Sequence, residues 1–120
     1  MKTTICKSFD FDAAHHLPAT PADHKCHRMH GHTYRVELIF EGVPTERDGW
    51  FIDYAEIAAA WAPIHTALDH RCLNDIEGLS NPTTEVLAPW IMRHINGEAA
   101  IFLIAVRVYE SSSTWCEVRR

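Results

Sequence analysis

The sequence lacks the features that mark several common classes of protein. No apolar run comes near the roughly 20 residues that a membrane-spanning helix needs. The formal net charge is −5, whereas a nucleic-acid-binding surface would carry an excess of lysine and arginine. No Cys-x-x-Cys pair is present, although this spacing is common in structural zinc sites. We therefore expect a protein that binds neither membranes nor nucleic acids.

The cysteines do not form a disulfide pattern. Their number would permit two bridges, but their positions are scattered. The N-terminal stretch MKTTICKSFDFD carries charges where a secretion signal has its apolar segment. Reduced thiols and a cytoplasmic location are the expectation. The cysteines are Cys6, Cys26, Cys72 and Cys116.

Histidine, in contrast, is frequent, with nine residues in a chain of 120. Four of them lie with Cys26 in HKCHRMHGH, residues 24–32, which concentrates potential metal ligands in one place. The content of 47% hydrophobic and 22% charged residues is typical of a folded globular protein. We expect a single domain over residues 1–120.

Two segments alternate between apolar and polar residues, as in strands with one buried face. In residues 5–15 the apolar row ends on His15, and in residues 30–41 it begins with His30 and His32. If these strands pair as an antiparallel hairpin, the three imidazoles lie at the same end of the same face.

Three neutral imidazoles suit Zn²⁺ and leave a fourth position for water or substrate, as in catalytic zinc sites. A lone histidine is more often a hydrogen-bonded core residue, but three on one face predict a zinc centre. The connecting loop, residues 16–29, contains Cys26, and long loops in compact domains are often functional. The remaining histidines of this region are expected to be solvated loop residues: His16, His24 and His27.

The middle of the chain has helical spacing. Residues 49–54 are expected to be extended, after which Asp53 can cap a helix with Glu56 as its capping-box partner. Pro63 lies inside the apolar stripe, where proline costs on the order of 3 kcal/mol, so we expect the helix to kink or break there. A second helix is expected after NPTTE, residues 81–85, and Pro89 lies inside it without explanation.

Two further strands are expected over residues 101–110 and 115–118. The order of elements predicts an α+β fold, a four-stranded antiparallel sheet with two helices on one face. The other face of the sheet is also fairly apolar in sequence, through residues such as Leu103 and Ala105. An uncovered apolar face is unfavourable in a monomer, so we expect a homo-oligomer.

Two acidic positions have both a plain and a functional interpretation. Asp69 and His70 follow the first helical region, and an Asp-His pair acts as a relay only if the turn aims both side chains into one cleft. Glu110 ends the apolar row of a strand, where a carboxylate is usually solvated. Its place in that row favours a functional role modestly.

Six segments, in this order, resemble the 6-pyruvoyl-tetrahydropterin synthase family over nearly the whole chain. Within the family, the C-x3-H-G-H spacing is most similar to the bacterial 6-carboxy-5,6,7,8-tetrahydropterin synthases of queuosine (7-deazaguanine) biosynthesis. The segments are FDAAH (11–15), CHRMHGH (26–32), GWFIDY (49–54), LDHRCLND (68–75), NPTTE (81–85) and YE (109–110).

The resemblance implies a tunnelling fold (T-fold), in which subunits join their sheets edge to edge into a barrel as trimers or dimers of trimers. It implies active sites between subunits. It assigns His15, His30 and His32 to zinc and Cys26 to proton acceptance. The remaining implied roles are a charge relay of Asp69 and His70, a pterin-binding carboxylate at Glu110 supplied by a neighbouring subunit, and pterin-pocket positions at Thr84 and Glu85.

The resemblance also implies a reaction. The substrate is 7,8-dihydroneopterin triphosphate, and the products are 6-carboxy-5,6,7,8-tetrahydropterin, acetaldehyde and triphosphate. One alternative is a 6-pyruvoyl-tetrahydropterin synthase, which eliminates triphosphate but keeps the three-carbon side chain. The other is a non-catalytic zinc-binding module, against which the missing Cys-x-x-Cys pairs argue.

Overall fold

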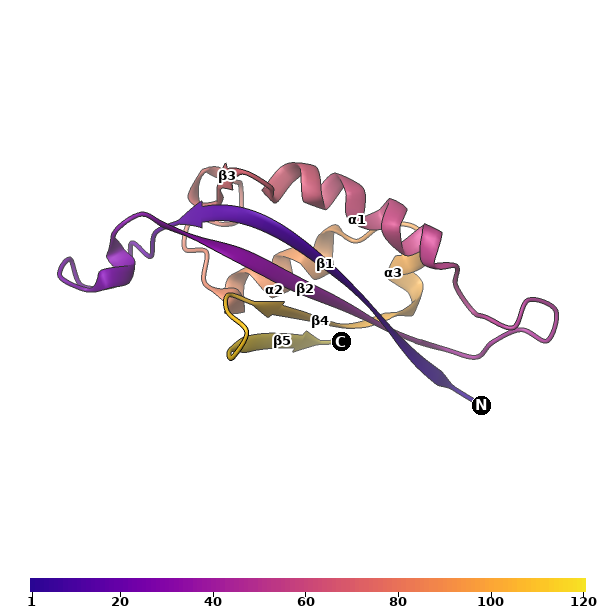
Figure 1. The fold of residues 1–120 in the computed structure, drawn as a ribbon. Helices are drawn as coiled ribbons and strands as arrows, with labels where there is room; N and C mark the ends of the chain where they lie inside the picture. The colour runs from indigo at the N-terminus through magenta and orange to yellow at the C-terminus, as the bar shows by residue number, and fades with distance from the viewer.

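The computed structural model describes residues 1–120 as one sheet with helices on one face (Figure 1). The sheet order is β3-β1-β2-β4-β5, with antiparallel neighbours except for the parallel pair β1 and β3. The strands are β1 (Thr3–His15), β2 (His30–Gly42), β3 (Arg71–Cys72), β4 (Leu103–Tyr109) and β5 (Trp115–Arg119). The α-helices are α1 (Tyr54–Leu68), α2 (Thr84–His94) and α3 (Glu98–Phe102), and two 3₁₀ turns are η1 (Lys25–His27) and η2 (Leu73–Asp75).

The predicted α+β class is confirmed, with two additional elements. The two-residue strand β3 and the five-residue helix α3 are too short to produce a periodic pattern in the sequence. Residues 49–54 are not an extended strand: they form a bend that leads into α1, whose first residue is Tyr54. As predicted, Asp53 caps α1, and its carboxylate accepts the Ala55 N–H at 2.8 Å.

The hairpin of β1 and β2 has the predicted register at the histidine end. His15 lies opposite His30, and Ala13 lies opposite His32. The apolar rows of both strands face the helices, and Tyr34, Val36, Leu38 and Phe40 are completely buried there. The long strands therefore carry the core along their length and the histidines at one end.

The start of β4 differs from the prediction because of a β-bulge. Phe40 pairs with Leu103 while Ile39 pairs with Ala105, so Ile104 is the extra residue. Leu103 therefore turns into the core, with 1% of its surface exposed. A period of two cannot anticipate this shift, because the bulge reverses the alternation.

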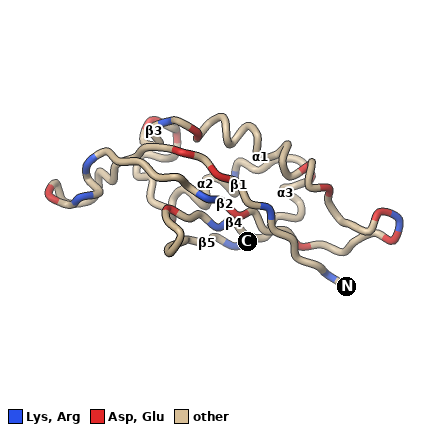
Figure 2. Tube along the Cα trace, in the orientation of Figure 1, with Lys and Arg blue, Asp and Glu red and all other residues tan.

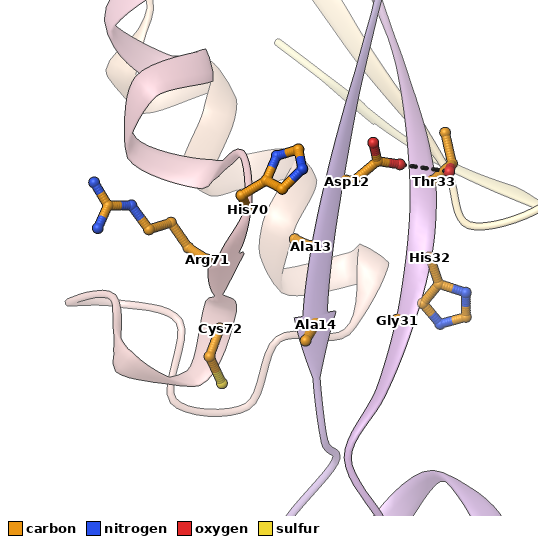
Figure 3. Close-up of a pocket in the computed structure, with 9 residues that line it drawn as sticks. All are labelled: Asp12, Ala13, Ala14, Gly31, His32, Thr33, His70, Arg71 and Cys72. Carbon is orange, nitrogen blue, oxygen red and sulfur yellow. Dashed lines mark hydrogen bonds between the residues drawn. The ribbon is translucent and has the colours of Figure 1, made fainter.

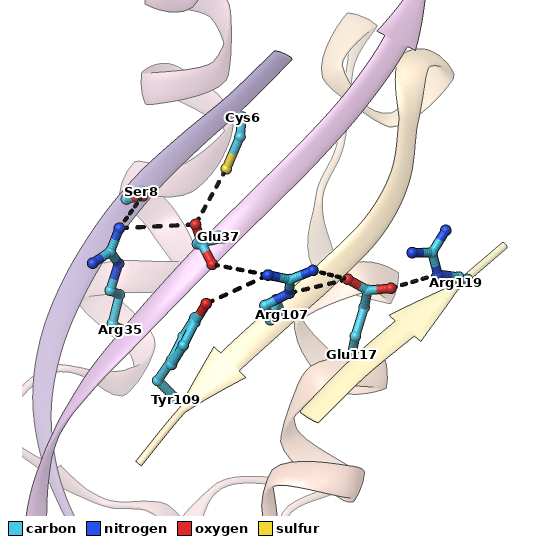
Figure 4. A network of polar contacts seen from close by, with 8 residues as sticks. All are labelled: Cys6, Ser8, Arg35, Glu37, Arg107, Tyr109, Glu117 and Arg119. Atoms are coloured by element: carbon cyan, nitrogen blue, oxygen red, sulfur yellow. Dashed lines mark hydrogen bonds and ion pairs between the residues drawn. The ribbon is translucent and has the colours of Figure 1, made fainter. Parts of the chain in front are cut away.

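The second face of the sheet is polar, which contradicts the expected apolar face. Arg107 binds Glu117 through Nε at 3.0 Å and Nη2 at 2.8 Å, and its Nη1 lies 3.8 Å from Oε1 of Glu37 (Figure 4). Arg35 and Arg119 extend this row of charges. Alternate positions of β2, β4 and β5 thus form a ladder of ion pairs. The expectation of a homo-oligomer therefore loses its support from an uncovered apolar face.

Helix α1 does not break at Pro63, which was one of the two predicted outcomes. The helix is continuous from Tyr54 to Leu68. Proline has no N–H, so the Ala59 carbonyl has no helical donor. Ala59 and Pro63 are both on the exposed side of the helix, where water can donate to this carbonyl instead. Pro89 in α2 is accommodated similarly, because the carbonyl that it leaves unbonded belongs to exposed Glu85 in the first turn.

Lys and Arg are interspersed with Asp and Glu along the chain instead of gathering on one face (Figure 2). No helix combines the length and the apolar character that a membrane crossing requires.

The continuity of α1 leads to a stability prediction. Replacing Pro63 by alanine restores a helical hydrogen bond, which should raise the free energy of unfolding by roughly 3 kcal/mol. The unfolded chain also becomes more flexible, which lowers this gain by up to about 1 kcal/mol. We therefore expect a net stabilisation of about 2 kcal/mol. Urea unfolding followed by circular dichroism measures the change. Pro44→Ala, in a segment outside every helix, is the control and should give no gain. A loss of stability in Pro63→Ala would contradict the account.

Candidate active site

The three predicted histidines meet at the end of the β1–β2 hairpin. Nε2 of His15 lies 3.0 Å from Nε2 of His30 and 3.2 Å from Nε2 of His32. All three potential ligand atoms lie within 4.8 Å of one another. One ion at bonding distance of roughly 2.0–2.1 Å from each nitrogen can therefore contact all three rings.

The far nitrogens of two rings are held by backbone carbonyls. Nδ1 of His15 lies 2.9 Å from the Pro82 carbonyl, and Nδ1 of His30 lies 2.7 Å from the Arg28 carbonyl. A carbonyl only accepts, so in the neutral ring the proton resides on Nδ1 and the lone pair on Nε2. Two Nε2 lone pairs then face each other at 3.0 Å, an arrangement that a shared cation relieves.

Burial keeps these rings in the form that binds metals. Desolvation lowers the pKa of His15 and His32 below the usual histidine value of 6.5, and the neighbouring His30 acts in the same direction. His15 is the one buried polar side chain of the chain, with 1% of its surface exposed. Burial therefore favours the neutral imidazole at His15 and His32, the form that metal coordination requires.

The three histidines line a pocket of about 400 Å³ together with Cys26 and Glu110. Glu110 directly follows β4 of the same chain, and its charge acts on His15 and His32. The implied reach of Glu110 from a neighbouring subunit is thus not needed, because it already lies beside the histidines of its own chain. Lys25 and Leu17 complete the lining.

Cys26 sits in the turn η1, which other loop residues hold in place. The Cys26 N–H donates to Nδ1 of His24 at 3.1 Å, and the Cys26 carbonyl accepts the Leu17 N–H at 2.8 Å. Nδ1 of His27 lies 3.1 Å from the Thr20 carbonyl. His24 is an exposed loop residue, as expected, and His27 is half-buried; both also form hydrogen bonds with the loop backbone. Residue type alone gave no signal of this.

Asp69 and His70 form a hydrogen-bonded pair at the outer edge of β1. Oδ2 of Asp69 accepts from Nδ1 of His70 at 2.8 Å, and Oδ1 accepts the Asp12 N–H at 3.0 Å. The Asp12 hydrogen bond is the largest cause of a lowered pKa at Asp69, and the hydrogen bond to Asp69 is the largest cause of a raised pKa at His70. His70 has a left-handed backbone with φ of 57°, an uncommon state for a residue other than glycine.

This pair does not lie in the pocket of Cys26. His70 lines a second, open pocket of about 610 Å³ with Asp12, Thr33 and Cys72 (Figure 3). The two pockets share only His32. Within one chain, the structure therefore brings Cys26 and Glu110 to the histidines but leaves Asp69 and His70 apart from them.

Thr84 and Glu85 also lie outside the pocket of the three histidines. Oγ1 of Thr84 donates to Oε1 of Glu85 at 2.7 Å in the first turn of α2. Both side chains act on the thiol of Cys116 in β5, whose pKa is raised mainly by burial and next by the charge of Glu85. Within one chain, Thr84 and Glu85 therefore do not join the histidines, Cys26 and Glu110 in a single pocket, and their role in pterin binding stays a prediction.

Comparison with known proteins identifies the family. The family model described as 6-pyruvoyl tetrahydropterin synthase matches residues 4–120. The chain belongs to this family. It is 35% identical to the 6-carboxy-5,6,7,8-tetrahydropterin synthase of Synechocystis, covering 92% of this chain and 88% of that protein.

The relatives do not all have the same named activity. The 6-carboxy-5,6,7,8-tetrahydropterin synthase of Bacillus subtilis is 30% identical over 94% of this chain and 82% of its own. The dihydroneopterin monophosphate aldolase of Pyrococcus furiosus is 35% identical over 79% of this chain and 76% of its own. The fold matches the 6-pyruvoyl tetrahydropterin synthase of Caenorhabditis elegans, with a TM-score of 0.91, 21% identity, and coverage of 100% of this chain and 96% of that one.

The Asp69–His70 pair predicts a specific pH behaviour. Because the His70 pKa is raised above 6.5, its contribution to folding is complete below that pH and is lost as the pH rises through the folded pKa. The Asp69 contribution is present above 3.8 and is lost as the pH falls through its lowered pKa.

Asp69→Asn should therefore lower the His70 pKa towards 6.5, because the two largest causes of its rise both come from Asp69. An NMR titration of the His70 ring protons measures the shift. Asp75→Asn, which changes an exposed carboxylate in the following turn, is the control and should leave the titration unchanged. An unaltered His70 pKa in Asp69→Asn would contradict the pairing.

Proposed function

We propose that the chain is a zinc-dependent carbon–carbon lyase that converts 7,8-dihydroneopterin triphosphate and water to 6-carboxy-5,6,7,8-tetrahydropterin, acetaldehyde and triphosphate, a step of queuosine biosynthesis. The observation that carries the proposal is one pocket lined by three convergent imidazoles, a thiol and a carboxylate. The relatives named 6-carboxy-5,6,7,8-tetrahydropterin synthase in Synechocystis and Bacillus subtilis support the choice of reaction.

His15, His30 and His32 would hold the zinc ion, and three neutral nitrogen ligands leave a position for substrate. When bound, zinc supplies a Lewis acid that polarises the side-chain oxygens of the substrate. The Pro82 and Arg28 carbonyls orient the His15 and His30 rings, so the ligand nitrogens are already directed at one point.

Cys26 takes a proton from the side chain of the substrate. The thiolate is the reactive form of cysteine, and positive charge close by stabilises it. Lys25 lines the same pocket and supplies such a charge. Glu110 lies across the pocket, where its two carboxylate oxygens can accept hydrogen bonds from the amino and ring N–H groups of the pterin.

The Asp69–His70 pair returns the proton from across a subunit boundary. His70 is largely exposed, with 78% of its side-chain surface accessible, and it lies at the edge of β1. β3 pairs only with Ala13 and Ala14 of β1, so most of this long strand has an outer edge without a strand partner. Such edges favour pairing with another chain. Edge-to-edge assembly into a barrel, as a trimer or dimer of trimers, would bring the pair to the Cys26 pocket of the next subunit.

The products of the reaction distinguish the candidate activities. A 6-pyruvoyl-tetrahydropterin synthase would release triphosphate without acetaldehyde, because all three side-chain carbons stay on the pterin. An aldolase, the activity named for the Pyrococcus furiosus relative, would release a two-carbon aldehyde that keeps its phosphate. Incubation with dihydroneopterin triphosphate and mass spectrometry of the products decides among them. A non-catalytic zinc-binding module would bind zinc and leave the substrate intact.

Cys26→Ala and His30→Ala should separate proton transfer from metal binding. We expect Cys26→Ala to keep its zinc and lose turnover by about 10²–10⁴-fold, the usual contribution of a general base. His30→Ala should lose zinc while remaining folded, because His30 is only half-buried and lies at the end of the hairpin, outside the hydrophobic core. Zinc content by atomic emission and acetaldehyde release measure the two effects. Full turnover in Cys26→Ala would remove the proposed role of the thiol.

The shared site predicts complementation between two inactive variants. When Cys26→Ala and His70→Ala chains are co-expressed, random mixing in a closed ring places the two intact residues at one boundary in about one case in four. Activity should therefore return to about a quarter of the wild-type value. Each variant expressed alone is the control. Absence of any recovery in verified mixed oligomers would place the Asp69–His70 pair outside the site of the neighbour.

A further inference from the structure

The carboxamide of Asn74 makes three hydrogen bonds to the backbone beside the site, and its Oδ1 also lies 3.8 Å from Sγ of Cys72. The proposed chemistry does not use this side chain. Oδ1 accepts the His16 N–H at 3.0 Å. Nδ2 donates to the His16 carbonyl at 2.8 Å and to the Ser80 carbonyl at 3.3 Å. A single half-buried side chain thus satisfies both backbone groups of the residue that follows His15.

These contacts extend the β1–β3 ladder by one step through a side chain instead of the backbone. Ala14 pairs with Cys72, so the next step of a parallel register sets His16 against Asn74. The backbone of Asn74 is not available for that step, because it has already turned into η2. The side-chain amide carries the same donor and acceptor as a peptide group and takes its place.

Asn74 therefore acts on two parts of the site. On one side, the Ser80 carbonyl belongs to the segment that leads to Pro82, whose carbonyl accepts from Nδ1 of His15. On the other side, His16 lies between His15 and Leu17, and the Leu17 N–H binds the Cys26 carbonyl at 2.8 Å. The hydrogen bonds from Asn74 to His16 thus hold the chain between His15 and the loop that carries Cys26.

We propose that Asn74 is a positioning residue of the active site, which fixes the end of β1 so that His15 meets the metal and the Cys26 loop meets the substrate. The inference rests on the proposed function, because it assigns a purpose to geometry around the metal and the thiol. Asn74 does not line the pocket of the three histidines, and its hydrogen bonds to the backbone go to His16 and Ser80.

The test is Asn74→Ala, measured first by zinc affinity in competition with a chromophoric chelator. We expect a loss on the order of 10- to 100-fold, as for other residues that orient metal ligands. The absorption bands of the Co²⁺-substituted protein should shift, since they report ligand geometry directly. In the zinc-loaded enzyme, kcat should fall more than KM rises, because Glu110 and the pterin-binding end of the pocket are unchanged.

Asp53→Ala is the matched control, since it removes one side-chain hydrogen bond at the cap of α1 and contacts none of the site residues. It should lower the melting temperature and leave zinc affinity and the Co²⁺ spectrum unchanged. If Asn74→Ala does not fold, Asn74→Ser, which is too short to bridge His16 and Ser80, replaces it in the same comparison.

Unchanged zinc affinity and spectrum in the folded Asn74 variant would overturn the inference, as would an equal loss in Asp53→Ala. Either result leaves the proposed function standing, provided that the wild-type protein binds zinc and releases acetaldehyde. A wild-type protein that does neither would overturn the proposed function, and this inference with it.

Discussion

The register of the β1–β2 hairpin is the constraint on which the rest of the site depends. His15 lies directly opposite His30, and a slip of one residue would send one of the two rows to the other face of the sheet. The neighbouring pair Phe11 and Tyr34 resists such a slip, because their buried rings stack at 4.8 Å between centroids and 9° between planes. The Tyr34 hydroxyl also lies 3.3 Å from Nδ1 of His15, so the packing that sets the register touches the site itself.

A second constraint comes from chain segments that are remote in sequence. The His15 ring is oriented by the Pro82 carbonyl, which lies 67 residues away, whereas the His30 ring is oriented by Arg28, only two residues away. Oriented lone pairs lose less freedom when they bind an ion, which favours affinity. The hairpin alone would thus place three rings near one another, and the packing of the 80–82 segment against β1 is what directs the buried ring.

The sequence predicted the parts of the site that follow from periodicity. Alternation in β1 and β2 was sufficient to group His15, His30 and His32, because side-chain direction in a strand depends only on parity. The bulge at Ile104, the short elements β3 and α3, and the ion-pair ladder around Arg107 were missed. Each of these depends on contacts between segments distant in sequence, and neither propensity nor period carries that information.

The family resemblance predicted roles for residues whose spacing alone carried no signal, and the structure shows which of these residues lie near the histidines. Cys26 and Glu110 join the histidines in one pocket, which agrees with direct contact to one substrate. Thr84 and Glu85 do not, and their position beside Cys116 of the edge strand β5 places them near the second free edge of the sheet.

The division of the site between two regions of the chain has a physical basis. The thiol and the proposed metal ligands lie in a sheltered pocket on the helix-covered face of the sheet, where burial lowers the pKa of His15 and His32. In the proposed function, Asp69 and His70 shuttle a proton, and the solvated edge of β1 holds this pair with a raised pKa at His70 and a lowered one at Asp69. Joining the edge of one sheet to the pocket of the next brings the two environments together, so in the proposed assembly the free strand edges and the catalytic chemistry have a common explanation.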